Sequence, residues 1–411
     1  MPVALLVVVV VSRGGGAARV ATRSALDAAG AARDDLDART EHVRVTLGTR
    51  LATLLRHRNG DEGSKLAKSI AFFNNKGGVS KTTTCFNVGW MLAERGHRVV
   101  MVDADPQCNL TGMVLDLSGE DALEDFYKTN PGRNLKDALS PAFNSRPIPL
   151  APVDCVEVES RPGLFLIPGH VALAEDESSL SIAHQLSESL QGLRNLPGSF
   201  HHLFKITAEK YDADYVLIDL SPGLGAVNQN LVATANYFIV PCSPDVFSVM
   251  AVESLARVLP RWGSWAKRAV ELEALKDADY EFPAPDLKFL GVVIQRFRLK
   301  NSRPTKAFQT YFDKLSISIS DVLRPALDKS GMLLAADQYA DAGVADSMVI
   351  SEISDFNTLI ATSQQLRKPV FTLTPEEAGR GGRAGDITRS NIKTFRETFE
   401  QLVNRIESLT R

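Results

Sequence analysis

Short apolar runs alternate with amphipathic stretches along most of the chain beyond residue 66. The runs have the length and the β-branched and aromatic content of buried strands; they fall at 70–73, 98–103, 164–169, 215–219, 237–241 and 289–294, with 370–373 as a candidate edge strand. Stretches with helical spacing separate most of them, at 174–191, 198–210, 246–258 and 304–317. Such alternation is typical of βαβ units. We therefore predict an α/β fold, a mostly parallel sheet with helices on both faces.

The two ends of the chain depart from this alternation. Residues 1–66 are rich in Ala, Arg, Asp and Gly, and only a thin apolar stripe between Ala21 and Arg56 favours a helix. We interpret them as a low-order N-terminal extension, partly helical or disordered. The closing stretch, 391–409, predicts an amphipathic helix with one apolar face. That face comprises Ile392, Phe395, Phe399, Leu402, Val403, Ile406 and Leu409.

Composition divides the remainder of the chain. Residues 113–163 hold many Pro, Asn, Gly and charged residues, which is typical of a surface insertion, and the four glycines within 374–388 favour a mobile loop. We therefore expect an extension at 1–66, one domain at 67–373, and a mobile loop followed by the amphipathic helix at 374–411.

Charge and cysteine content narrow the class of protein. A net charge of −3 argues against a generally basic nucleic-acid binder, although it allows a local basic patch. The four cysteines lack metal-ligand spacing, so we interpret them as reduced thiols of a cytoplasmic protein. No apolar run approaches the roughly 20 residues that a membrane-spanning helix needs.

The stretch 73–83 joins the first apolar run to a predicted helix at 84–94, and it contains glycines, a lysine and a threonine in series. A strand, a glycine-containing loop and a helix N-terminus together form a concavity of backbone N–H groups that favours anions. Lys81 would reach the β- and γ-phosphates of a nucleotide, and the Thr82 hydroxyl would bind Mg²⁺. The strict pattern G-x-x-x-x-G-K-[ST] is not met, because Asn75 and Ser80 stand where it requires glycine.

An extra lysine before the glycine pair resembles the deviant Walker A loop, K-G-G-x-x-K-T-[ST], of the ParA/MinD (Soj-like) family of partitioning ATPases. The resemblance implies a P-loop NTPase fold. It assigns ATP binding to Lys76, Gly77, Gly78, Val79, Ser80, Lys81, Thr82 and Thr83, with Gln295 and Arg296 near the base. It further implies that Lys76 reaches across an ATP-dependent homodimer to the partner's nucleotide, so that Lys76 and Lys81 are both catalytic.

Two further motifs stand in the order expected for that family. Asp103 and Asp105 lie in a run that resembles D-x-D-P-Q-x-N-x-T, and Asp219 ends an apolar strand as in a Walker B motif. By the resemblance, Thr82, Asp103 and Asp219 hold Mg²⁺, and Asp105 orients the attacking water. The family usually has a second proline where Ser221 stands.

The resemblance therefore implies a Mg-ATP-binding, weakly hydrolysing ATPase that dimerises on ATP and acts as a switch in DNA, plasmid or chromosome partitioning. Two basic clusters offer a surface for non-specific DNA, and association with the nucleoid would follow. They comprise Arg296, Arg298, Lys300, Arg303 and Lys306 after the sixth apolar run, and Arg380, Arg383, Arg389, Lys393 and Arg396 near the end.

Two alternatives stay open at this point. One is a MinD-like membrane-positioning ATPase, although the closing helix mixes acidic and basic residues on its polar face, which favours packing against the body over a membrane surface. The other is an ATP-gated regulator of a protein partner. An activating protein partner is expected in the partitioning case as well.

Overall fold

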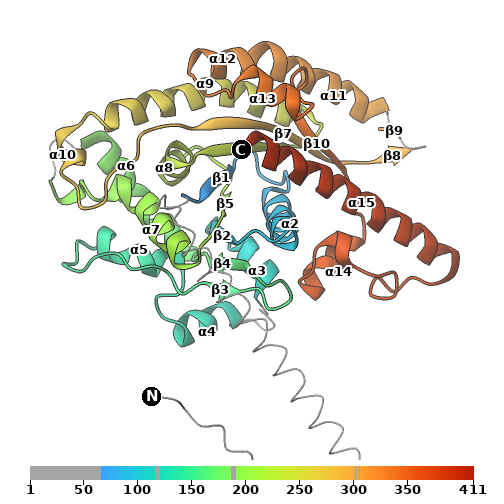
Figure 1. The fold of residues 1–411 in the computed structure, drawn as a ribbon, viewed down its shortest axis with the longest axis horizontal. Helices are drawn as coiled ribbons and strands as arrows, with labels where there is room; N and C mark the ends of the chain where they lie inside the picture. The colour runs from blue at the N-terminus through green and yellow to red at the C-terminus, as the bar shows by residue number, and fades with distance from the viewer. Residues whose placement is uncertain (1–65, 116–120, 187–190, 301–302, 305) are drawn as a thin grey trace, which may run out of the picture. The chain divides into compact units, whose positions relative to one another are not determined.

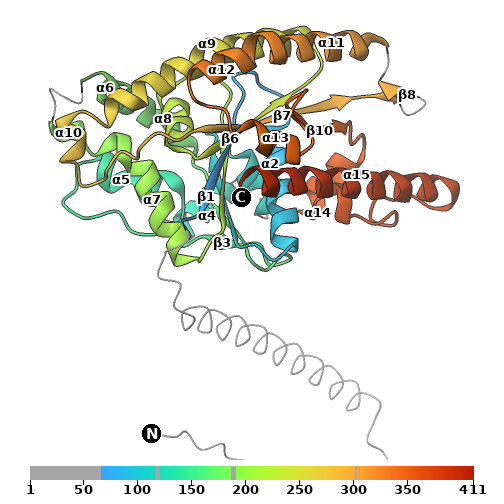
Figure 2. The same ribbon diagram turned by 45° about the horizontal axis from the view of Figure 1, so that its top comes forward.

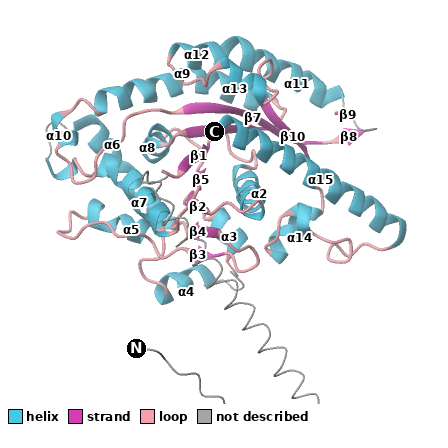
Figure 3. Ribbon diagram, in the orientation of Figure 1, coloured by secondary structure: helices cyan, strands magenta, loops and turns pink. Residues whose placement is uncertain are grey.

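The computed structural model describes residues 66–115, 121–186, 191–300, 303–304 and 306–411. In this part of the chain eight strands form one sheet (Figures 1 and 3). They are β1 (Lys68–Phe72), β2 (Val99–Ala104), β3 (Val156–Glu157), β4 (Leu164–Ile167), β5 (Tyr215–Leu220), β6 (Tyr237–Cys242), β7 (Lys288–Phe297) and β10 (Val349–Ser354). A separate pair, β8 (Leu299–Lys300) and β9 (Arg303–Pro304), is antiparallel.

The order of strands across the sheet is β10-β7-β6-β1-β5-β2-β4-β3. Every neighbouring pair is parallel except β3 with β4. The predicted mostly parallel α/β sheet is thus confirmed. Because β1 lies between β5 and β6, the chain reverses its direction of travel across the sheet beside β1, and parallel sheets bind ligands at such a point.

Helices cover both faces of the sheet (Figures 1 and 2). The main ones are α2 (Lys81–Glu94), α5 (Leu135–Phe143), α6 (Asp176–Leu186), α7 (Leu196–Lys210), α8 (Ala226–Thr234), α9 (Val246–Ala269), α11 (Lys306–Ile317) and α15 (Gly382–Leu409). Shorter ones are α3 (Asn109–Val114), α4 (Ala122–Thr129), α10 (Glu273–Lys276), α12 (Arg324–Lys329), α13 (Ala336–Asp341) and α14 (Leu359–Leu366). Right-handed crossovers place α2 on one face, where α15 packs on it, and α7, α8 and α9 on the other.

The closing helix packs against the body, as its charge pattern favoured. All seven residues of its predicted apolar face are buried. At its end, the Thr410 hydroxyl pairs with that of Tyr215 at 3.2 Å, and Glu407 accepts a hydrogen bond from Arg95 at 2.6 Å. The helix begins at Gly382, earlier than predicted, so the expected loop at 374–388 is shorter. Gly385 allows the backbone at Arg380 to pack closely against the helix, because a Cβ on Gly385 would lie 3.2 Å from the Arg380 carbonyl oxygen.

The edge of the sheet differs from the prediction. Residues 370–373 were expected as a strand, but Val370–Thr372 form a 3₁₀ turn that starts after Pro369. The edge strand is β10 instead, which pairs in parallel with β7. Its sequence, VISEIS, mixes polar and apolar residues, because an edge strand is buried less completely than a central one.

The stretch 113–163 contributes more buried side chains than its composition, typical of a surface insertion, predicted. Leu135, Leu139, Leu150 and Val153 are each at most 5% exposed and belong to the main core, although α4 has no buried residue. The interpretation of residues 1–66 as a partly helical extension lies, except for Leu66, outside the described residues. Among those that are described, every helix is too short or too polar to cross a membrane.

Candidate nucleotide site

The loop between β1 and α2 lies at the carboxyl edge of the sheet, and its backbone is unusual. Gly78 has φ +70°, a left-handed conformation that glycine adopts readily. Ser80, the residue before α2, has φ +57° and ψ +36°, which costs a residue with a Cβ about 1 kcal/mol. This conformation is retained because it turns the chain from the loop into the helix. The Ser80 carbonyl then accepts the Thr84 N–H at 3.0 Å, closing the first turn of α2.

The two lysines of the loop point to different partners. Lys81 is 6% exposed, and its ammonium lies 3.4 Å from the carbonyl oxygens of Asn74 and Lys76. Burial lowers the pKa of Lys81, while Asp219 and Asp105 act in the opposite direction.

Lys76 instead pairs within its own chain. Its ammonium forms an ion pair with Asp245 and donates to the Ser248 hydroxyl at 3.1 Å. Asp245 is also the N-cap of α9, because its Oδ1 accepts the Ser248 N–H at 2.9 Å. The side chains of Lys76 and Asp245 are 20% and 38% exposed, so this pair is open to solvent and to competing anions.

The carboxylate of Asp103 accepts three hydrogen bonds from protein groups. Its Oδ2 accepts the N–H and the hydroxyl of Thr111 at 2.7 and 2.6 Å, and its Oδ1 accepts the Asp105 N–H at 3.2 Å. Burial raises the pKa of Asp103 to about 6, against the effect of these hydrogen bonds. Thr111 accepts the Gly169 N–H at 2.9 Å, and Tyr127 of α4 donates to the Gly169 carbonyl at 2.8 Å.

Asp219 is opposite Asp103 in the register of β2 and β5, but its surroundings differ. It is fully buried, and neither carboxylate oxygen has a partner of good hydrogen-bond geometry among the described residues, although the Thr82 hydroxyl lies near it. Burial raises its pKa well above the usual range and Asp103 adds to the shift, although Thr82 and Lys81 lie close enough to favour the charged form. A buried carboxylate without a partner is costly unless a cation compensates it.

These donors fit Mg²⁺ on one condition. The described residues contain no group of three or more His, Cys, Asp or Glu side chains able to hold a metal by themselves. Mg²⁺ commonly takes only one or two carboxylates and completes its shell with water and substrate phosphate. Asp219, Thr82 and Asp103 would therefore hold Mg²⁺ only together with a bound polyphosphate. The ion would neutralise negative charge on the phosphates.

Asp105 and the loop after β5 complete the edge. Asp105 is 7% exposed, and its Oδ1 accepts the Gln107 N–H at 3.0 Å. Pro222 approaches the phosphate loop, since a Cβ on Gly77 would lie 3.7 Å from its ring. Asn228 holds the loop by donating to the Ser221 and Gly223 carbonyls at 3.0 and 3.2 Å. The structure thus brings all the predicted loop residues and all three aspartates to one edge.

Comparisons with known proteins agree with this geometry. A family model described as an AAA domain matches residues 67–270. The chromosome partitioning protein ParA of Caulobacter vibrioides is 30% identical over 198 residues, which cover 47% of this chain and 62% of that protein. Residues 67–270 belong to the ParA/MinD family. An uncharacterized protein of Methanocaldococcus jannaschii, MJECL24, is 26% identical over 240 residues, which cover 58% of this chain and 77% of that protein.

The fold of this chain is also found among solved structures. Protein DIP2308 from Corynebacterium diphtheriae superposes with a TM-score of 0.54 at 23% identity, over 73% of this chain and 97% of that one. Since the match to the Caulobacter ParA spans less than two thirds of that protein, only the family and the fold are carried over here.

Gln295 has a contact that the ParA/MinD resemblance did not indicate. It was expected near the base, but it is 2% exposed, and its amide donates to the Val79 carbonyl at 2.7 Å. Arg296, expected beside it, donates to the Gly78 carbonyl. Both side chains are therefore directed at the phosphate loop itself.

Two acidic residues of the site were missed by sequence reasoning. Asp245 had a usable signal, because Asp-x-x-Ser before a helical run is a typical N-cap pattern. Glu177 of α6 had none: its carboxylate accepts the N–H groups of Ala226 and Val227 at the start of α8. Gly225 allows this approach, since a Cβ there would lie 2.3 Å from the carboxylate.

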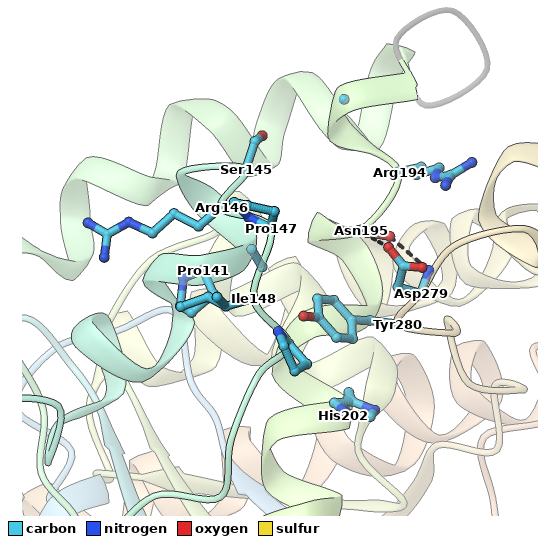
Figure 4. Close-up of a pocket in the computed structure, with 13 residues that line it drawn as sticks. Pro141, Ser145, Arg146, Pro147, Ile148, Arg194, Asn195, His202, Asp279 and Tyr280 are labelled. Carbon is cyan, nitrogen blue, oxygen red and sulfur yellow. Dashed lines mark hydrogen bonds between the residues drawn. The ribbon is translucent and has the colours of Figure 1, made fainter.

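A cavity of about 670 Å³ lies between the loop after α5, the start of α7 and the segment after α10 (Figure 4). Asn195 and Asp279 exchange two hydrogen bonds there, at 2.8 and 2.9 Å, and the ring of Tyr280 contacts that of His202 at a tilt. None of the predicted ParA/MinD site residues lines it, so we assign it no part in nucleotide binding.

Proposed function

We propose that this protein is a Mg-ATP-dependent switch that dimerises on ATP, hydrolyses it slowly and separates afterwards, acting in DNA, plasmid or chromosome partitioning. The observation that carries this proposal is the convergence of two loop lysines and three aspartates at one edge of the sheet. An anion site next to an uncompensated buried carboxylate suits a nucleotide that brings its own divalent cation.

Each part of the edge has a role in that reaction. The loop N–H groups and Lys81 would bind the phosphates, and Asp219 with Thr82 and Asp103 would hold Mg²⁺. Asp105 would orient the attacking water, because a carboxylate near the γ-phosphate can accept its hydrogen bond. We predict that Asp105→Ala retains ATP binding, loses most turnover and accumulates the dimer; normal turnover in a coupled phosphate-release assay would remove Asp105 from the mechanism.

Lys76 links the nucleotide to dimerisation. In the described chain it is held by Asp245, so a second copy's γ-phosphate would have to compete with that ion pair. Partly exposed pairs are worth up to about 1 kcal/mol, and phosphoryl transfer concentrates negative charge on the γ-phosphate oxygens. Exchange of Lys76 from Asp245 to a partner's nucleotide is therefore energetically accessible, and it would make ATP part of the interface.

The name of the Caulobacter relative supports partitioning over the alternatives. The basic residues near the end of the chain support DNA as the surface, since Arg380, Arg383, Arg389 and Lys393 are exposed. The membrane alternative has less support: α15 would have to leave the body and withdraw seven buried apolar residues. Cytoplasmic location and an activating protein partner remain part of the proposal.

The test combines light scattering with co-sedimentation. We expect a monomer with ADP, a dimer with ATP and magnesium, and retention on non-specific DNA only with ATP, lost at high salt. Retention on liposomes that depends on α15 would favour the membrane alternative. A protein that stays monomeric with ATP, and turns over equally well as Lys76→Ala, would refute the proposal.

A further inference from the structure

The outer side of the phosphate loop carries three successive carbonyl groups, and each has a partner outside the loop. The carbonyl oxygens belong to Gly78, Val79 and Ser80, and their partners are Arg296, Gln295 and Thr84 in that order. Two of the partners come from consecutive residues at the end of β7, more than 200 positions away in sequence. This arrangement fixes the orientation of three peptide planes.

Fixing these carbonyls also fixes the N–H groups on the other side of the loop. In a trans peptide the C=O and the next N–H point in opposite directions, and the described chain has no cis peptide. Carbonyls held outward at 78, 79 and 80 therefore turn the N–H groups of Val79, Ser80 and Lys81 inward. Successive inward N–H groups are what an anion-binding loop requires.

Gln295 is placed for this task. Its buried amide donates to the Val79 carbonyl at 2.7 Å and to the Thr84 hydroxyl at 2.9 Å. The Thr84 hydroxyl can then donate to the Ser80 carbonyl, 2.8 Å away. Both amide hydrogens of Gln295 thus act on the loop, directly or through one hydroxyl.

Arg296 reaches the loop through an uncommon backbone conformation. Its φ of +64° is left-handed, which costs a residue other than glycine free energy and persists only where the surroundings enforce it. The guanidinium lies on the Gly78 carbonyl and is exposed. An Arg there adds a charged donor to the outer side of the loop.

We propose that Gln295 and Arg296 are positioning residues, a carbonyl clamp that orients the phosphate loop before nucleotide arrives and thereby sets the affinity for its phosphates. This inference rests on the proposed function, since it concerns the same site. Neither residue has to touch the nucleotide. Because a pre-oriented loop loses less conformational freedom on binding, the clamp governs affinity and not the turnover of a saturated site.

Matched variants separate the clamp from general packing. Gln295→Glu keeps the shape but places a carboxylate oxygen where a donor faced the Val79 carbonyl. Arg296→Ala removes the charged donor, and Arg296→Lys restores one. Two exposed residues elsewhere serve as controls: Gln365→Glu on α14, and Arg261→Ala on α9.

The first experiment is hydrogen–deuterium exchange on the full-length protein without nucleotide. We expect amide exchange in the segment 79–84 to be about tenfold faster in Gln295→Glu and severalfold faster in Arg296→Ala, and unchanged in both controls. Arg296→Lys should return partway to the wild-type rate. Wild-type exchange in Gln295→Glu would overturn the clamp.

The second experiment measures ADP binding by calorimetry and ATP turnover at saturation. Gln295→Glu should bind ADP about tenfold more weakly, with turnover at saturation within about twofold of wild type. Faster exchange with unchanged ADP affinity would overturn the role in affinity. If the wild-type protein bound no ADP, the proposed function would fail, while the exchange result would still decide the clamp.

Discussion

The phosphate loop and the end of β5 are adjacent parts of one site, yet the protein satisfies their polar groups in opposite ways. Around the loop, the carbonyls of Gly78, Val79 and Ser80 are all hydrogen-bonded by protein donors. At the end of β5, both oxygens of the fully buried Asp219 lack a partner of good hydrogen-bond geometry among the described residues. The carbonyl groups of the loop are thus satisfied within the protein, whereas the carboxylate at the end of β5 is not. Under the proposed function, a bound cation would compensate that carboxylate.

The largest expected effect comes from removing the buried lysine of the phosphate loop. Lys81→Ala deletes a buried ammonium that the phosphates would contact, so we expect ADP affinity to fall by at least about 100-fold. Lys329→Ala, an exposed lysine on α12, is the control and should bind normally. Titration with a fluorescent ADP analogue measures both; wild-type affinity in Lys81→Ala would contradict the assignment of the loop.

The second prediction concerns the carboxylate of Asp219 at the end of β5. Since burial raises the pKa of Asp219, the folded protein binds its proton more tightly than the unfolded chain does. The contribution of Asp219 to the free energy of unfolding is therefore fully present below about pH 3.9. It is lost as the pH rises through the raised pKa. Asp219→Asn should remove that loss and stabilise the nucleotide-free protein at pH 7, with little effect near pH 4.

Urea unfolding at several pH values measures this difference. The same variant should lose magnesium-dependent strengthening of nucleotide binding, because the amide cannot neutralise a cation. A variant that is equally destabilised at pH 4 and pH 7 would show that Asp219 is tolerated without a compensating ligand. The contrast between the two parts would then disappear.

A smaller effect concerns the link between the loop and α9. Asp245→Asn keeps an oxygen to cap α9 but removes the charge that holds Lys76. Since a partly exposed pair is worth up to about 1 kcal/mol, we expect dimerisation at an ATP concentration about two- to fivefold lower. Analytical ultracentrifugation across an ATP series measures this shift. An unchanged series would mean that the ion pair does not restrain Lys76.

The smallest effect is local to the backbone of the loop. Ser80→Gly relieves a left-handed conformation and should stabilise the protein by up to about 1 kcal/mol, provided that the greater freedom of glycine in the unfolded chain does not offset the gain. Thermal unfolding without nucleotide measures it. A loss of stability would show that the contacts of the serine and the greater freedom of glycine in the unfolded chain together outweigh the strain.

The sequence predicted what depends on local pattern. The central strands, the loop with Lys76 and Lys81, and the three aspartates all followed from runs of a few residues, and the structure places them at one edge. The pairing of Lys76 with Asp245 spans 169 positions, and that of Gln295 with Val79 spans 216. Side-chain contacts over such separations depend on how β6 and β7 pack beside β1, and no local periodicity encodes them.

The order of strands bears on where this chain can be cut. The segment shared with the family model ends at residue 270, whereas β7 begins at Lys288 and β10 at Val349. A protein shortened to that segment would leave one side of β6 without its neighbour, an open strand edge of the kind that recruits other chains into aggregates. It would also expose the α2 surface on which α15 packs. We therefore expect that expression of the domain that carries the phosphate loop needs the chain through Leu409.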